Sequence, residues 1–135
     1  MSFSSPSFMA GGTIAPSIFV KVDVTAGAAN DHQVVACGAG GRCIGISQEG
    51  MKRPPGLPGS DITIAAETGN TLRVYGLTEE CLLTLGGTVT HGDFLKSDAS
   101  GNGVAASTGD LYGAMAEESG VSGQKVRVQV VFGTR

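Results

Sequence analysis

Glycine and proline interrupt this chain so often that helices of ordinary length cannot form along most of it. Its 135 residues include 22 glycines and 5 prolines, and a glycine inside a helix costs about 1 kcal/mol relative to alanine. Short strands joined by turns tolerate this spacing, and no helical pattern separates the strand candidates. The sequence therefore predicts a mainly β fold, a small β-barrel or β-sandwich of short antiparallel strands.

Strand candidates follow one another at short intervals. Within residues 18–24, every second residue from Val20 onward is valine, as in a strand with one buried face. Residues 125–132 show the same alternation from Val126 onward. The other predicted strands cover residues 33–37, 43–47, 62–66, 71–75, 80–85, 94–97, 103–106 and 111–116.

Glycines also suggest how some of these strands are connected. The turn at 38–41 separates two short β-branched runs and predicts a hairpin-like return. Residues 43–50 and 111–118 share a pattern of two apolar residues, a glycine and then small or apolar residues leading to glutamate. A glycine inside a strand marks a bulge, a bend or a close backbone approach. Equivalent bends at Gly45 and Gly113 would suit two halves of one barrel.

The first sixteen residues differ in composition from the rest. Residues 1–16 are rich in serine, glycine and proline and show no sustained period, so we expect an extended N-terminal arm followed by a single β domain at 17–135. Phe3, Phe8 and Ile14 are the large apolar residues of this arm. Such residues either fold back onto their own domain or dock on a partner.

Charge and hydropathy exclude several classes of function. The net charge is −3, and lysine and arginine are scattered, so the basic surface needed for direct nucleic-acid binding is missing. No run of about 18 apolar residues predicts a membrane span. The N-terminus lacks a basic region followed by an apolar core, so we expect no signal peptide and synthesis in the cytoplasm.

The three cysteines are Cys37, Cys43 and Cys81, an odd number without CxxC spacing. Each lies among small or apolar residues, which favours buried structural thiols. Two alternatives remain open: a strained disulfide between Cys37 and Cys43 across the glycine turn, or a metal site that these two share with His32.

No stretch of the sequence predicts catalysis or cofactor binding. The glycines at 38–41 lack the lysine and serine or threonine of a phosphate-binding loop, and residues 93–103 lack the ligand spacing of a calcium loop and favour a polar turn. The least implausible hydrolase site would combine His91, Asp93 and Cys81, but His91 lies in a turn-like sequence. We therefore expect a non-enzymatic protein without a catalytic, cofactor or metal site.

A series of short motifs resembles the decoration, or cement, proteins of tailed-phage heads. Residues 87–101, GTVTHGDFLKSDASG, contain a valine, then Gly-Asp, then a hydrophobic pair and Asp-x-x-Gly. In the same order as in that family follow a Val-x-Ala strand, an apolar-Gly-x-Ala strand and a Gly-x-x-Val-x-Val ending, here at 104–106, 112–116 and 123–128. With the segment at 42–48, the resemblance spans most of residues 30–132 and leaves the arm uncovered.

The resemblance implies a homotrimer on the outer surface of the expanded head, where it clamps neighbouring major capsid subunits. Repetition over a symmetric lattice lets modest contacts hold such a protein in place. The candidate contacts are the apolar residues of the arm and the basic loop that contrasts with the acidic whole: Phe3, Phe8, Ile14, Lys52, Arg53 and Pro54.

A second hypothesis is a small-ligand or carbohydrate-binding β module at another virion site. Only 5% of the residues are aromatic and tryptophan is absent. Because sugar-binding surfaces use exposed aromatic rings, the composition favours the decoration protein.

Overall fold

The computed structural model describes residues 7–12, 14–22, 33–47 and 71–135, and these form two β-sheets. The mainly β prediction is confirmed, and the described residues include no helix, hence none that could cross a membrane. The first sheet contains β1 (Ser7–Ala10), β2 (Phe19–Val22), β3 (Gln33–Ala36), β4 (Gly45–Ser47) and β5 (Thr71–Tyr75). The second contains β6 (Glu80–Thr84), β7 (Phe94–Ser97), β8 (Gly103–Ala105), β9 (Leu111–Ala116) and β10 (Lys125–Thr134).

The first sheet closes into a barrel with the order β1-β3-β2-β4-β5. All neighbouring pairs are antiparallel except β1 and β3, which run parallel. The hairpin predicted across the 38–41 turn is therefore wrong, because β3 and β4 lie on opposite sides of β2. Val20 of β2 pairs with Ala36 on one side and Gly45 on the other. The connection between β3 and β4 crosses the end of β2 and is longer than a hairpin loop needs.

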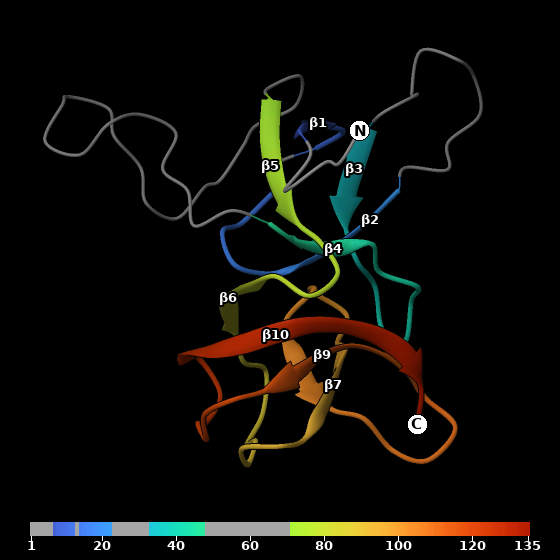
Figure 1. Ribbon diagram of the computed structural model, residues 1–135. Helices are drawn as coiled ribbons and strands as arrows, with labels where there is room; N and C mark the ends of the chain where they lie inside the picture. Colours follow the sequence, from blue (N-terminus) through green and yellow to red (C-terminus); the bar gives the residue numbers. More distant parts are fainter. Residues whose placement is uncertain (1–6, 13, 23–32, 48–70) are drawn as a thin grey trace, which may run out of the picture.

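The second sheet has the order β6-β10-β9-β7-β8. Its long strand β10 crosses beneath the barrel and curves along its whole length (Figure 1). An isolated parallel bridge between Leu85 and Gly103 brings the chain after β6 next to the start of β8. The two edges of the sheet thus meet at one point, which shields part of each edge from pairing with another chain.

One hydrophobic cluster spans both sheets, and a second cluster fills the barrel. Phe19 of the barrel is fully buried in the same cluster as the alternating valines of β10, which confirms the pattern predicted from Val126 onward. Backbone hydrogen bonds also join the sheets: the Phe19 N–H donates to the Gly101 carbonyl at 2.8 Å, and the Thr84 N–H donates to the Ser17 carbonyl at 2.8 Å. Barrel and sheet therefore pack as one unit.

Part of the expected arm belongs to the barrel. β1 pairs with β3 on one side and with β5 on the other, so Ser7–Ala10 close the barrel. The chain that follows is held by the Ser47 hydroxyl, which donates to the Ala15 carbonyl at 2.8 Å and accepts from the Ile18 N–H at 3.1 Å. Ala10 of β1 is fully buried in the hydrophobic cluster of the barrel. The strand predicted at 62–66 lies outside the described residues.

Candidate functional site

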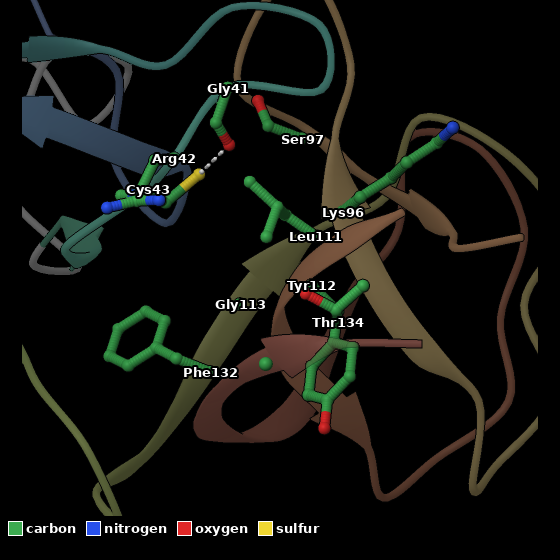
Figure 2. A pocket seen from close by; sticks show the side chains of 11 residues that line it. Gly41, Arg42, Cys43, Lys96, Ser97, Leu111, Tyr112, Gly113, Phe132 and Thr134 are labelled. Atoms are coloured by element: carbon green, nitrogen blue, oxygen red, sulfur yellow. Dashed lines mark hydrogen bonds between the residues drawn. The ribbon is translucent and has the colours of Figure 1, made fainter. Parts of the chain in front are cut away.

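A cavity of about 310 Å³ opens where the barrel meets the second sheet. One wall is the loop between β3 and β4, and the other is formed by β7, β9 and the end of β10 (Figure 2). Its volume is at the lower limit for small-molecule pockets. The lining residues are Gly41, Arg42, Cys43, Lys96, Ser97, Leu111, Tyr112, Gly113, Phe132, Gly133 and Thr134.

An irregularity in β10 supplies the aromatic part of the cavity wall. Strict alternation would bury residue 132 with the valines at 126, 128 and 130, but the register against β9 shifts between Val130 and Gly133. Phe132 is therefore 40% exposed and lines the cavity. Tyr112 of β9 completes this wall, and its ring stacks on Phe94 with the centroids 4.3 Å apart. A bulge near the end of one strand thus shapes the site.

The positive charges at the cavity differ in their surroundings. The Lys96 ammonium lies 2.7 Å from Asp110, and the two side chains are 28% and 33% exposed. This hydrogen bond, helped by the Ser107 N–H, lowers the pKa of Asp110. Arg42 is exposed on the opposite wall. Asp110 offsets the charge of Lys96, and Arg42 adds a positive charge on the other wall of the cavity.

Two cysteine thiols lie in contact beside this cavity. The Cys43 Sγ donates to the Cys37 Sγ at 2.8 Å and is also 3.5 Å from the Gly41 carbonyl oxygen, the contact drawn in Figure 2. The hydrogen bond from Cys43 lowers the pKa of Cys37 from 9.0 to about 7, against the effect of burial and with smaller help from Ser97, Lys21 and Gly38. The same hydrogen bond raises the pKa of Cys43. Above about pH 7 the pair therefore shares one proton.

The contact residues predicted from the sequence are only partly described. Ile14 is fully buried, and Phe8 is partly buried against the same barrel cluster. In this conformation Ile14 has no surface left for a partner, whereas Phe8 keeps some. Phe3 and the loop residues Lys52, Arg53 and Pro54 lie outside the described residues, so their role as capsid contacts stays a prediction.

The residues of the hydrolase alternative occupy different environments. Cys81 of β6 is 8% exposed in the core and pairs with Val128 of β10, whereas His91 is exposed on a turn and its Nδ1 lies 3.2 Å from the Ser119 hydroxyl. The Asp93 carboxylate accepts from the Thr90 N–H at 3.0 Å and so closes that turn. No cluster of three or more possible metal ligands occurs within the described ranges. His32, considered as a metal ligand with two cysteines, lies outside them.

The polar turn predicted near residue 98 is confirmed. Asp98 Oδ1 accepts from the N–H groups of Ser100 and Asn102 at 2.8 and 2.9 Å. Its carboxylate therefore stabilises the turn in the manner of an Asx turn. Gly101, at φ 87°, then meets the barrel at Phe19. The Asp-x-x-Gly motif thus has a structural role at the junction of the two sheets.

Sequence reasoning did not identify the cavity. In the sequence, Leu111, Tyr112 and Phe132 fall only in predicted strands, and Arg42 only in the 42–48 segment of the family resemblance. The available signal was the pair Val130-Val131 followed by Phe132 and Gly133, which breaks the alternation of β10. Such a break indicates a bulge, but it does not specify which side chain turns toward a neighbouring loop.

The fold is similar to that of a phage protein of known structure. The chain matches the head fiber gp8.5 N base of bacteriophage phi29 with a TM-score of 0.56 and 15% sequence identity. The match covers 93% of this chain and 92% of that chain. No protein-family model matches the sequence, and no curated protein matches it. At this identity, the similarity shows a shared fold.

Proposed function

We propose that this chain is a structural virion protein on the outer surface of the expanded phage head, where it cements neighbouring major capsid subunits as a homotrimer. The observation that carries the proposal is the fold shared with a phage head fiber base over nearly the full length of both chains. The motif series at 87–128, which resembles head decoration proteins, supports the same location. Such a role requires surfaces that bind and no reacting groups.

The proposed capsid contacts are Phe3 and the basic loop residues Lys52, Arg53 and Pro54. Phe8 has part of its surface available, and Ile14 would take part only if the segment after β1 left the barrel. Positive loop residues on an otherwise acidic protein suit an acidic capsid surface. Several weak contacts, repeated over the capsid lattice, would then hold each trimer in place.

Co-sedimentation with expanded heads that lack the protein tests this proposal. Saturable binding of the purified chain supports it, and weaker binding by the double variant Lys52→Ala, Arg53→Ala assigns the loop. The matched control is Lys125→Ala, Arg127→Ala, which removes two exposed charges from β10. A protein that stays in the supernatant at all concentrations contradicts the proposal, and light scattering of the free protein checks the trimer.

The cavity favours a second candidate, a module that binds a small ligand or carbohydrate at another virion site. Tyr112, Phe132 and Leu111 give the cavity an apolar wall of the kind that sugar rings and other compact ligands pack against. Under this alternative, Phe132→Ser abolishes ligand binding. Under the main proposal it leaves the binding of heads unchanged.

A further inference from the structure

The sulfur atoms of Cys37 and Cys43 lie close enough together for a disulfide bond to form with little movement. Cys37 follows β3 directly and is 1% exposed, whereas Cys43 is half-buried and lines the cavity. Their sulfur atoms lie 2.8 Å apart. Gly41 makes this possible, because a Cβ atom at that position would lie 3.0 Å from the Cys37 Sγ.

We propose that Cys37 and Cys43 are a site of reversible oxidation, at which an intramolecular disulfide forms with a low-molecular-weight disulfide as the oxidant. The two sulfurs need to approach by about 0.8 Å to reach the usual bond length of about 2.04 Å. Residues 37–44 lie outside the strands, so this movement leaves the β-ladders intact. The inference does not depend on the proposed function.

The bond would connect the two strands that flank β2. The Cys37 N–H donates to the Phe19 carbonyl at 3.0 Å, and the Ile44 N–H donates to the Val20 carbonyl at 2.9 Å. The loop is therefore already fixed to β2 at both ends. A disulfide across the loop would close a short ring. It would reduce the conformational entropy of the unfolded chain and hold β3 and β4 together on either side of β2.

The exchange has a defined order, because only one thiol faces the cavity. The Cys43 sulfur attacks one sulfur of oxidised glutathione as its proton passes to Cys37, and the first glutathione leaves as a thiolate. The Cys37 sulfur then gives up this proton and attacks the Cys43 sulfur of the mixed disulfide, releasing the second glutathione. The two protein sulfurs, which start with one proton between them, are oxidised to a disulfide, and one glutathione disulfide is reduced to one glutathione thiolate and one glutathione thiol that takes this proton. In the mixed disulfide Cys43 no longer donates to Cys37, but Ser97, Lys21 and the Gly38 backbone, which also lower the pKa of Cys37, remain in place for the second step.

Trypsin digestion of the intact protein gives a direct test, because Arg42 lies between the two cysteines. After incubation with oxidised glutathione, alkylation and digestion without reductant, we expect peptides 22–42 and 43–52 to be joined, with Cys81 alkylated in peptide 74–96. The midpoint of thermal unfolding should rise by about 5 °C and return after reduction. Separate, fully alkylated peptides would overturn the proposal.

Single substitutions test the order of the two steps. Cys37→Ser should retain one glutathione on Cys43, whereas Cys43→Ser should gain none on the buried Cys37. Cys81→Ser is the matched control and should still form the disulfide. Thermal unfolding of each reduced variant shows whether it is folded, and the wild-type digest decides the proposal even if one variant is not. Glutathione on Cys37 of a folded Cys43→Ser variant would contradict the assigned order.

Discussion

The Phe19 ring of β2 lies against Gly113 of β9, with its Cε1 atom 2.8 Å from where a Cβ atom at position 113 would be. Phe19 is fully buried, and a strand pair and a hydrogen bond to Gly101 hold its backbone. The ring therefore has little room to move. The absence of a side chain at position 113 sets how closely the barrel approaches the second sheet.

Gly113→Ala should lower the free energy of unfolding by about 1–3 kcal/mol, because the added methyl group overpacks the junction. Urea unfolding monitored by circular dichroism measures the loss. Gly87→Ala is the matched control, since a Cβ there meets its nearest neighbour at an ordinary 3.7 Å. Equal stability of the two variants would contradict the close packing. If the Phe19 ring is the obstacle, Phe19→Leu should reduce the cost of Gly113→Ala in a double-mutant cycle.

The reduced cysteine pair should make stability depend on pH above neutrality. Cys37 ionises at a pKa of about 7 in the folded protein, against 9.0 ordinarily. Between these values the unfolded chain binds more protons, so stability should rise from pH 7 to 9. Above pH 9 the raised pKa of Cys43 reverses the sign, because the folded protein keeps a proton that the unfolded chain loses.

Urea midpoints at several pH values, with a reductant present, measure this dependence. Cys43→Ala removes the hydrogen bond that contributes most to the low pKa of Cys37, so the rise from pH 7 to 9 should shrink in that variant. Ultraviolet absorbance of the thiolate gives an independent reading of the same titration. An equal slope in wild type and Cys43→Ala would show that the pair does not share a proton.

The ion pair of Lys96 and Asp110 predicts a separate effect in acid. The low pKa of Asp110 stabilises the folded protein above the ordinary carboxyl pKa of 3.8, and this contribution disappears as the pH falls through the folded value. Asp110→Asn removes the charge and keeps an oxygen for the Ser107 N–H, whereas Asp110→Ala removes both. We expect a small loss of thermal stability in the first variant and a larger one in the second.

A measured carboxyl titration of Asp110 checks the cause of this effect. In Lys96→Met the pKa of Asp110 should rise toward its ordinary value, because the largest contribution to its lowering is gone. Nuclear magnetic resonance of the carboxyl carbon reports the value directly. An unchanged pKa would assign the lowering to the Ser107 N–H instead.

Local patterns in the sequence were sufficient to predict every described strand except β1, which lies in the predicted arm, but they did not predict which strands are neighbours. The alternating valines of β10 and the glycine turn at 38–41 occur where expected, because each depends on residues adjacent in the chain. The pairing of β2 between β3 and β4 depends on contacts between distant segments, which a glycine turn does not encode. Gly45 and Gly113 were expected to be equivalent, yet the first faces the Tyr75 backbone and the second the Phe19 ring.

The cavity and the contact between the two cysteines were likewise not predictable from local sequence patterns. Both sulfurs had been considered for a disulfide from their spacing alone, but their contact depends on how residues 37–44 cross the end of β2. Phe132 faces the cavity because of a bulge, and bulge positions are set by the partner strand. Tertiary packing therefore determines the site, while local sequence determines the elements that carry it.

The pairing of β1 predicts that two N-terminal truncations differ in stability. Deletion of residues 2–6 removes Phe3 and leaves every described strand, so the urea midpoint should stay close to that of wild type. Deletion of residues 2–12 also removes β1, exposes the edges of β3 and β5 and takes the buried Ala10 from the core. We expect this variant to lose at least about 2 kcal/mol of unfolding free energy.

The urea midpoints of the two truncated variants also decide which of them can be used to test binding of the protein to phage heads. If the longer deletion unfolds the barrel, its failure to bind says nothing about the contact surface, because β1 closes the barrel. The shorter deletion keeps the barrel and tests Phe3 alone. Equal urea midpoints for both truncations would mean that the barrel does not need β1. Residues 2–12 would then act as the arm that the sequence predicts, and the longer deletion would become the valid binding test.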